Sequence, residues 1–418
     1  MIFETDFRHL TPASAATAYF STTAARVFSI LNDPSSWGQA RIPRVASATS
    51  PSKVVLTFDG VERATVTISS WRTDFCQLEV VLDGFSTDAD RAELESYWVD
   101  VWQMLVNRLG QRSSVVASSP AKVNVFFAVG AFLKNGFHEV ASCYQALSLR
   151  EVLSVELEGR FSIEIAGPYA SLSKETVPTD ASNLVYKAGL ALKKLNPEVS
   201  PELVAFVIHK SVPIAGGMAG GSADGAAALL ALDKLFGTEL GATLQKAAAK
   251  LGSDVPFSLQ GGTAIGTGRG EKLSKIETGA ILHWVMTPSP IGLSTPDVYR
   301  KLDIMRTESG VDVSTLEKPE VPAELVAALV SGNAAEVAHY MHNDLEIAAL
   351  ALRPELAETI EAGRKAGALK SMVSGSGPTI AHLAKDRIHA EQIMNRLGAA
   401  GLPSIATYTS VSGTRLEN

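Results

Sequence analysis

A glycine-rich segment stands directly before an alanine-rich one in PIAGGMAGGSADGAAALLAL, residues 213–232. The alanine and leucine residues predict a helix, with Ser222 as its candidate N-cap. The preceding run ELVAFVIHKSVP (202–213) predicts a strand. A strand, a glycine loop and a helix in this order have two interpretations. The loop is either a loose surface turn or a cradle of backbone N–H groups that binds phosphate at the positive end of the helix.

This loop differs from two common nucleotide-binding motifs. No Lys-Ser or Lys-Thr pair closes it, so it is not a Walker A loop. Its glycines also lack the spacing and the following acidic residue of a Rossmann fingerprint. The loop alone therefore does not distinguish a turn from a phosphate site.

The composition sets limits on the kind of protein. With 418 residues, 46% hydrophobic and 19% charged, the chain has room for two or three globular domains. A net charge of −7 offers no basic surface, so we expect neither nucleic acid nor a membrane as partner. Two cysteines outside any CxxC spacing argue against a disulfide scaffold or a zinc site. Without a signal peptide or an apolar run of about 18 residues, a cytoplasmic location is expected.

The first part of the chain predicts a sheet and a long helix. A short helix at 23–33 precedes strand patterns at 53–60, 63–71 and 75–85. In the helix predicted over 90–110, Trp98 and Trp102 fall on the apolar face. This order resembles the helix-grip domain of the Aha1-like, START-related (SRPBCC) superfamily, assigned here to residues 1–112. The resemblance implies a possible apolar ligand, although core packing is the favoured role of both tryptophans.

Three further stretches after the polar seam GQRSS (110–114) bear on the glycine loop. In SSPAKVNVFFAVG (118–130), Lys122 and Asn124 alternate along a strand and share one face. A lysine in this run either contacts a bound anion or lies on an edge strand, where it discourages pairing with another sheet. Asp254 precedes an apolar segment. Burial or a nearby cation can shift the pKa of its carboxylate there, or the residue can serve as a helix cap or turn aspartate. The sequence SGSGP (374–378) predicts a second glycine loop, either at a ligand or in a tight turn.

Taken in order, these stretches resemble the GHMP kinase superfamily from about Val115 to about Thr409. The resemblance rests on SPAKVNVFF, NGFHEV, PIAGGMAGGSADGAA, GSDVPFSLQGGTAIGTGRGE, GLSTPDVYRKLD and SGSGPT. It implies an α+β, two-lobed kinase, with a ribosomal protein S5 domain 2-like lobe at 115–278 and a ferredoxin-like lobe at 279–418. Within the superfamily, the pattern is most similar to members that phosphorylate the 2-hydroxyl of 4-diphosphocytidyl-2-C-methyl-D-erythritol in the non-mevalonate isoprenoid pathway.

The resemblance also implies roles for individual residues, with ATP and Mg²⁺ as cofactors. Asp254 would be the catalytic base and Lys122 its electrostatic partner, while Ser222 is a candidate for contacting Mg²⁺. The acceptor substrate would be bound by Asn124, Phe137, His138, Thr295 and Tyr299. The positions implied around ATP are Pro213, Ile214, Ala215, Gly216, Gly217, Met218, Ala219, Gly220, Gly221, Ser222, Ala223, Asn183, Leu184 and Lys210.

Some positions depart from the family pattern, and two other functions remain open. Met218 and Ala219 replace a Leu-Gly pair, Ala223 replaces a serine, and Phe137 stands where tyrosine is common. One alternative is a GHMP kinase with another alcohol substrate, against which NGFH and STPDVY argue. The other is a ligand-binding regulatory protein whose kinase half senses nucleotide. The sequence leaves the oligomeric state open between monomer and homodimer.

Overall fold

The computed structural model divides the chain into two compact units. The first comprises residues 1–116 with 416–418, and the second comprises residues 117–415. The residues that the structure describes are 4–6, 13–20, 22–58, 62–72, 75–109, 114–133, 136–157, 160–170, 177–214, 216–278, 280–410 and 412–417. The seam predicted at 110–114 lies almost wholly outside the described residues. None of the described helices is both long and apolar enough to cross a bilayer.

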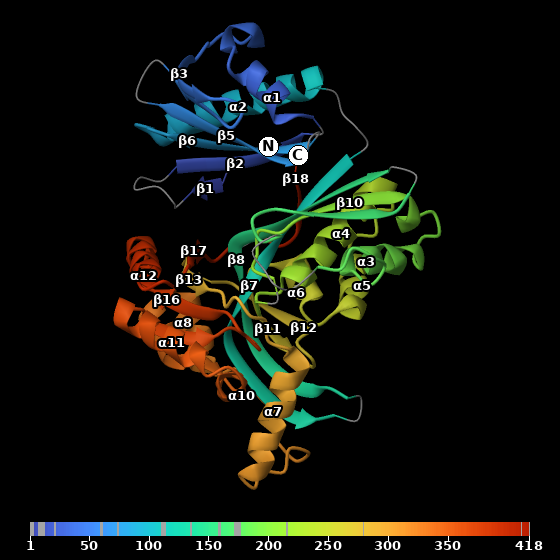
Figure 1. Ribbon diagram of the computed structural model, residues 1–418, viewed down its shortest axis with the longest axis vertical. Helices are drawn as coiled ribbons and strands as arrows, with labels where there is room; N and C mark the ends of the chain where they lie inside the picture. Colours follow the sequence, from blue (N-terminus) through green and yellow to red (C-terminus); the bar gives the residue numbers. More distant parts are fainter. Residues whose placement is uncertain are drawn as a thin grey trace. The chain divides into compact units, whose positions relative to one another are not determined.

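The first unit is built on a six-stranded antiparallel sheet in the order β1-β2-β6-β5-β4-β3. Helices α1 and α2 lie on one face of this sheet (Figure 1). The predicted helices and strands are present, but β1, β2 and β3 were not predicted. The elements in chain order are β1 (Glu4–Asp6), β2 (Ala13–Phe20), α1 (Ala24–Leu31), the 3-10 helix η1 (Pro34–Trp37), β3 (Arg44–Thr49), β4 (Lys53–Thr57), β5 (Arg63–Arg72), β6 (Phe75–Asp83) and α2 (Asp88–Leu109).

Aromatic side chains fill the core of the first unit. Trp98 of α2 is completely buried, and its ring meets that of Trp37 edge-on at a centroid distance of 6.1 Å. Trp102 packs against Phe20 at 4.6 Å. Both tryptophans belong to a single hydrophobic cluster with residues of the sheet. The prediction that they are core residues is therefore confirmed.

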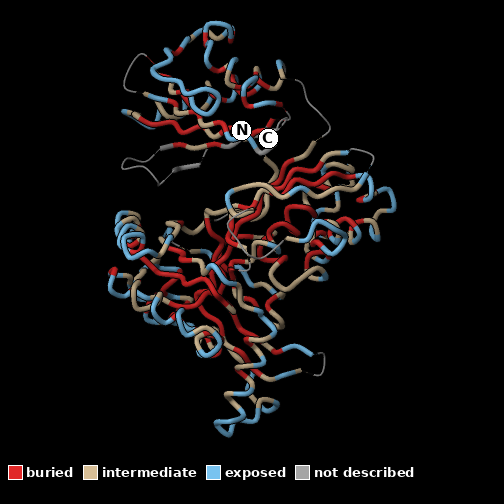
Figure 2. Tube along the Cα trace, in the orientation of Figure 1, coloured by how far each residue is buried: buried red, intermediate tan, exposed pale blue. Residues whose placement is uncertain are grey.

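The second unit contains two sheets. The larger has the order β12-β11-β8-β10-β9, and β7 pairs with β8, β14 and β18, while the smaller has the order β15-β16-β13-β17. Figure 2 shows that burial is concentrated along the strands of this unit. Its elements are β7 (Ser114–Phe132), β8 (His138–Leu157), β9 (Ser162–Ala166), α3 (Leu184–Lys193), the 3-10 helix η2 (Pro201–Leu203), β10 (Val204–His209), α4 (Gly220–Phe236), α5 (Thr243–Leu251), α6 (Val255–Gln260), β11 (Thr263–Thr267), β12 (Lys272–Ile276), β13 (His283–Thr287), α7 (Thr295–Glu308), α8 (Ala323–Ser331), α9 (Ala334–Tyr340), β14 (His342–Asn343), α10 (Glu346–Leu352), α11 (Glu355–Ala366), β15 (Lys370–Val373), β16 (Ile380–Ala384), α12 (Arg387–Ala399), β17 (Ile405–Tyr408) and β18 (Arg415–Glu417).

This topology brings the predicted motifs together. Helix α4 packs on strand β8 and on helices α3 and α6 (Figure 1). The strand with Lys122 and Asn124 is β7, which has partners within the sheet, and both side chains are buried. Lys122 N donates to Met218 O at 3.1 Å and the residue is 4% exposed, so Lys122 does not lie on a solvent-exposed sheet edge. The division of the second unit into lobes at 278/279 stays a prediction.

A buried histidine in the smaller sheet makes stability depend on pH. His382 of β16 is completely buried, and its ring nitrogens lie 3.0 Å from Thr287 Oγ1 and 2.8 Å from Ser371 Oγ. Burial lowers its pKa to about 4 from an ordinary 6.5. The unfolded chain binds a proton at His382 more tightly than the folded chain does. The free energy of unfolding is therefore fully maintained above pH 6.5 and falls as the pH drops toward 4.

We therefore expect His382 to lower the free energy of unfolding by about 3 kcal/mol as the pH falls from 6.5 to 4. Urea denaturation across this range would show a shallower pH dependence for His382→Gln than for the unmodified chain. The comparison uses the slope with pH, so a uniform destabilisation of the variant does not affect it. Equal slopes for the two chains would contradict the prediction.

Candidate active site

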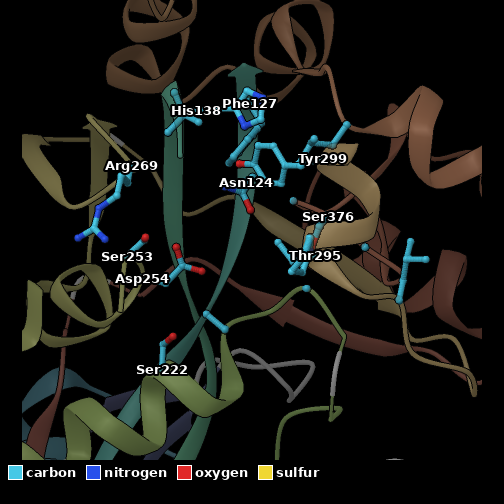
Figure 3. A pocket seen from close by; sticks show the side chains of 18 of the residues that line it. Asn124, Phe127, His138, Ser222, Ser253, Asp254, Arg269, Thr295, Tyr299 and Ser376 are labelled. Carbon is cyan, nitrogen blue, oxygen red and sulfur yellow. The ribbon is translucent and has the colours of Figure 1, made fainter. Parts of the chain in front are cut away.

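One cavity of about 880 Å³ in the second unit gathers most of the predicted site residues. The glycine loop and the start of α4 line one end, and aromatic side chains from β7, β8 and α7 line the other (Figure 3). The lining residues that sequence reasoning had singled out are Lys122, Asn124, Phe137, His138, Leu184, Gly216, Gly217, Ala219, Gly220, Gly221, Ser222, Asp254, Thr295 and Tyr299.

Lys122 is fixed at the bottom of this cavity by polar contacts. Its ammonium donates to Gly217 O at 2.8 Å and to the Asn124 side-chain oxygen. Asn124 in turn donates to Ser142 Oγ at 2.8 Å, which donates to a strand carbonyl. Burial lowers the pKa of Lys122, and the negative charge of Asp254 opposes that shift. The sequence expectation that Lys122 and Asn124 share one face is confirmed.

The two glycine loops lie against each other at this point. Gly217 has a φ of +71°, and a Cβ atom on it would lie 2.5 Å from Ser374 O of the SGSGP loop. Thr379 N, just beyond that loop, donates to Gly216 O at 3.3 Å. Gly375 approaches Lys122 so closely that a Cβ there would lie 3.0 Å from Nζ. The close approach of the two backbones leaves no space for larger residues at these positions.

Helix α4 begins earlier than predicted. Its N-cap is Ala219, with φ 59° and ψ 29°, and its first residue is Gly220. Ser222 is therefore not the N-cap, because the left-handed turn at Ala219 starts the helix three residues before it. Ser222 instead lies half-buried in the first turn, facing the cavity (Figure 3).

The left-handed Ala219 gives a simple prediction of stability. An alanine in this region of φ and ψ is strained by its Cβ atom, whereas glycine is not. We expect Ala219→Gly to raise the free energy of unfolding by up to about 1 kcal/mol, because relief of strain exceeds the added freedom of the unfolded chain. Urea denaturation would measure the change. A less stable variant would contradict the left-handed geometry at this residue.

Asp254 lies between the two ends of the cavity. It immediately precedes α6, and its side chain makes no capping hydrogen bond to that helix. Figure 3 places its carboxylate between Ser222 and the group formed by Asn124 and Tyr299. Burial raises the pKa of Tyr299, and the charge of Asp254 raises it further. The Asp254 carboxylate thus acts electrostatically on Lys122 and on Tyr299.

The far end of the cavity is aromatic. The rings of His138 and Tyr299 stack at a centroid distance of 5.0 Å and an angle of 25°. This contact leaves no room for a base between these two rings. His138 Nε2 lies 3.0 Å from Asp303 Oδ1, while Phe137 is 47% exposed at the cavity wall. Thr295 Oγ1 lies 2.8 Å from Ser376 Oγ and so joins α7 to the second glycine loop.

Several residues implied around ATP do not line the cavity. Met218 and Ala223 are completely buried, and Asn183 caps α3 by accepting from Val185 N. Pro213 and Ile214 precede the lining part of the loop. Ala215 lies outside the described residues.

Lys210 requires a correction. Its Nζ lies 2.5 Å from Glu151 Oε1 and 2.8 Å from Asp224 Oδ2, and all three side chains are buried. A Cβ on Gly220 would lie 2.9 Å from Glu151 Oε1, so this ion cluster lies directly against the start of α4. Lys210 therefore supports the helix that carries the loop, and its ammonium is not available to a ribose.

Sequence reasoning missed several residues that shape the site. Asn343 donates from its amide to Val373 O and Gly375 O, each at 2.8 Å, and so holds the second glycine loop. Asp303 fixes His138, and Arg269 lines the wall of the cavity. A polar residue such as Asn343 in a buried segment is a signal, but its partners lie about 30 residues away and cannot be identified without the fold.

No group of three or more histidine, cysteine, aspartate or glutamate side chains able to hold a metal occurs within the described part of the chain. A cation that enters with a nucleotide needs fewer protein ligands, because phosphate oxygens and water supply the rest. The Ser222 hydroxyl, the Asp254 carboxylate and the neighbouring Ser253 hydroxyl are oxygen donors of suitable chemistry on the stretch of cavity between the glycine loop and α6.

Comparison with known proteins gives consistent matches. Two family models match, "GHMP kinases N terminal domain" over residues 183–262 and "GHMP kinases C terminal" over residues 325–402. The 4-diphosphocytidyl-2-C-methyl-D-erythritol kinase of Leifsonia xyli subsp. xyli is 44% identical over 305 residues, which are 72% of this chain and 98% of the relative. The kinase of the same name from Streptomyces coelicolor is 47% identical over 292 residues, 69% and 93% of the two chains. The crystal structure of a 4-(cytidine 5'-diphospho)-2C-methyl-D-erythritol kinase superimposes with a TM-score of 0.56 at 30% identity and covers 71% of this chain and 99% of that one.

Proposed function

The chain belongs to the 4-diphosphocytidyl-2-C-methyl-D-erythritol kinase family of GHMP kinases, and we propose that it transfers the γ-phosphoryl group of ATP to the 2-hydroxyl of that cytidine-linked substrate. This reaction belongs to the non-mevalonate pathway of isoprenoid biosynthesis. The observation that carries the proposal is a single cavity with a glycine loop and helix N-terminus at one end, aromatic residues at the other and Asp254 between them.

Asp254 acts as the general base of the proposed reaction. It takes the proton of the 2-hydroxyl while that oxygen forms a bond to the γ-phosphorus, and the bond from that phosphorus to the bridging oxygen of ADP breaks. Lys122 lies close enough for the two charges to interact, since the charge of Asp254 opposes the lowering of the Lys122 pKa by burial. The ammonium of Lys122 also offsets part of the negative charge on the transferred group. Phosphoryl transfer needs little more than this positioning and charge stabilisation.

The triphosphate binds against the glycine loop and the first turn of α4. Gly216, Gly217 and the residues from Ala219 to Ser222 line the cavity there, and the helix N-terminus supplies unpaired N–H groups. Leu184, the first residue of α3, also lines the cavity, and α3 packs on α4, so adenine would contact Leu184 there. Mg²⁺ held by the phosphates would neutralise charge, with Ser222 as its protein contact.

The cytosine binds at the aromatic end through Phe137 and His138. If neutral His138 donates from Nε2 to Asp303, its Nδ1 is an acceptor suited to the amino group of cytosine. Phe137 offers an exposed ring on which the base stacks. Asn124, Thr295 and Tyr299 line the wall between this end and Asp254.

Removal of the carboxylate at position 303 tests this arrangement. Asp303→Asn can donate to Nε2 and so stabilises the other tautomer, which presents N–H rather than a lone pair to the cytosine amino group. We expect KM for the cytidine substrate to rise about tenfold while KM for ATP stays within about twofold. Steady-state kinetics with each substrate varied in turn would measure both. A parallel rise in the two KM values would indicate a general disturbance of the fold.

The choice of acceptor is tested with a panel of alcohols. The full chain with Mg²⁺ and ATP is expected to release ADP rapidly with the cytidine-linked substrate and to show only background rates with mevalonate or a hexose. Free CDP should inhibit the reaction by competing with the acceptor. Faster turnover of another alcohol, without inhibition by CDP, would assign the chain to a different GHMP kinase reaction.

For the first unit we propose a helix-grip domain of the Aha1-like type, as an addition to the kinase. The support is its antiparallel sheet with the long helix α2 packed on one face. Trp98 and Trp102 fill the space between helix and sheet, so an apolar ligand would have to displace them. Titration of the full chain with a prenyl diphosphate, followed by tryptophan fluorescence and kinase rate, tests ligand binding. Unchanged signals would remove that role.

A further inference from the structure

Arg269 is a cationic residue at the cavity wall to which no role has been assigned. It lies in the turn between β11 and β12, where its own N–H donates to Glu271 Oε2 at 2.7 Å. The turn is also joined to β8, because Val140 N donates to Gly268 O at 2.8 Å. The backbone of Arg269 is therefore fixed, and only the side chain has freedom.

The guanidinium of Arg269 lies against the aromatic end of the cavity. Its Cζ lies 4.9 Å from the centroid of the Phe137 ring. Its polar contacts within the described part of the chain are long, 3.4 Å to Ala249 O and 3.9 Å to Glu271 Oε2. A good N–H···O bond is 2.7–3.2 Å long, so the guanidinium retains hydrogen-bonding capacity. A half-buried arginine in this condition is suited to binding an anion.

Arg269 differs from the other cations of the cavity in its surroundings. Among the described residues that line it, the cationic side chains are Lys122, Arg269 and Arg300. Lys122 donates to Gly217 O and Asn124, and Arg300 donates to Asp297 at 2.8 Å. The Arg300 side chain is 69% exposed and that of Arg269 is 33% exposed, so Arg269 is the more sheltered of the two guanidinium groups.

The position of Arg269 indicates which anion it meets. Its guanidinium contacts Phe137, where the base is expected, and Figure 3 places its side chain on the wall that also carries Ser253 and Asp254. In the substrate of the proposed function, a diphosphate connects the cytidine to the alcohol. If the base is at Phe137 and the reacting hydroxyl at Asp254, the diphosphate has to cross the wall between them.

We propose that Arg269 binds the diphosphate of the acceptor substrate and thereby selects a nucleoside diphosphate over the free nucleoside. This assignment rests on the proposed function. The planar guanidinium forms paired hydrogen bonds to phosphate oxygens, and its contact with Phe137 fixes the orientation of that plane. The residue is a binding residue and takes no part in proton transfer.

The test compares the binding of CDP and cytidine to full-length chains by isothermal titration calorimetry. For Arg269→Gln we expect the Kd of CDP to rise about 10- to 100-fold, while the Kd of cytidine stays within about twofold. KM for the full substrate should rise by a similar factor with kcat within about threefold. Arg269→Lys should retain part of the CDP preference, because the charge remains but the planar fork is lost. Arg364→Gln, an exposed residue of α11, is the matched control for loss of one positive charge and should leave both Kd values unchanged.

Two results would overturn the assignment. If Arg269→Gln weakens cytidine and CDP equally, the guanidinium only supports Phe137. If it weakens neither, the diphosphate lies elsewhere. An unmodified chain that binds neither compound and turns over no cytidine-linked substrate would instead overturn the proposed function, and this assignment with it. Normal turnover by the unmodified chain keeps the two failures distinct.

Discussion

Replacement of Asp254 by asparagine is expected to lower kcat by about 10²- to 10⁴-fold and to leave the Kd of the acceptor within about threefold. Asparagine has nearly the same shape but cannot accept the hydroxyl proton in the transition state. The side chain makes no capping hydrogen bond to α6, so its loss should not disturb that helix. The effect should therefore fall on the chemical step alone. Single-turnover kinetics with calorimetric binding would separate the two quantities.

An exposed aspartate of the second unit provides the control for this experiment. Asp312→Asn removes one negative charge from an exposed turn, where the carboxylate accepts from Ser314, and should leave kcat unchanged. If Asp254→Asn lost turnover and acceptor affinity in proportion, the aspartate would have a structural role. If it kept normal kcat, another group would have to accept the proton.

Replacement of Lys210 by methionine is expected to lower the free energy of unfolding by about 3–5 kcal/mol. The ammonium is the shared partner of Glu151 and Asp224, and the three side chains are almost completely buried. Burial opposes the charged form of Lys210, but the two carboxylates outweigh it and raise its pKa. Without the lysine, two carboxylates would remain buried against the start of α4. These carboxylates would then have neither water nor a cation to stabilise their negative charge.

Urea denaturation would measure this loss. Lys193→Met provides the matched control, because Lys193 pairs with Glu202 at 2.5 Å on the surface, where solvent screens the pair. Neutralising the carboxylates as well, with Glu151→Gln and Asp224→Asn in the Lys210→Met chain, should recover part of the stability. Equal effects of Lys210→Met and Lys193→Met would contradict the account of a buried cluster.

The features of the site that sequence predicted depend on neighbours in the chain. Lys122 and Asn124 share a face because strand geometry alternates side chains every two residues. The glycine loop before α4 followed from glycine and alanine content, although the helix starts at Gly220 instead of beyond Ser222. The left-handed conformation at Ala219 sets that start, and propensity does not predict a left-handed alanine.

The features that sequence could not supply depend on distant partners. His138 and Asp303 are 165 positions apart, and only the fold brings them within 3.0 Å. Lys210 follows a strand in a motif typical of nucleotide sites, but its two carboxylate partners decide its role. In the first unit, β3 is exposed at every residue, so it has no alternation of apolar and polar positions by which to recognise it.

Identification of the reaction product tests the proposed phosphoryl transfer. The full chain, Mg²⁺, ATP and 4-diphosphocytidyl-2-C-methyl-D-erythritol would be followed by ³¹P NMR. We expect one new resonance from a phosphomonoester at the 2-oxygen of the substrate, formed in equal amount with ADP, while the diphosphate resonances of the substrate are retained. Binding of the substrate without a new phosphomonoester, or release of ADP with inorganic phosphate alone, would contradict the proposed transfer.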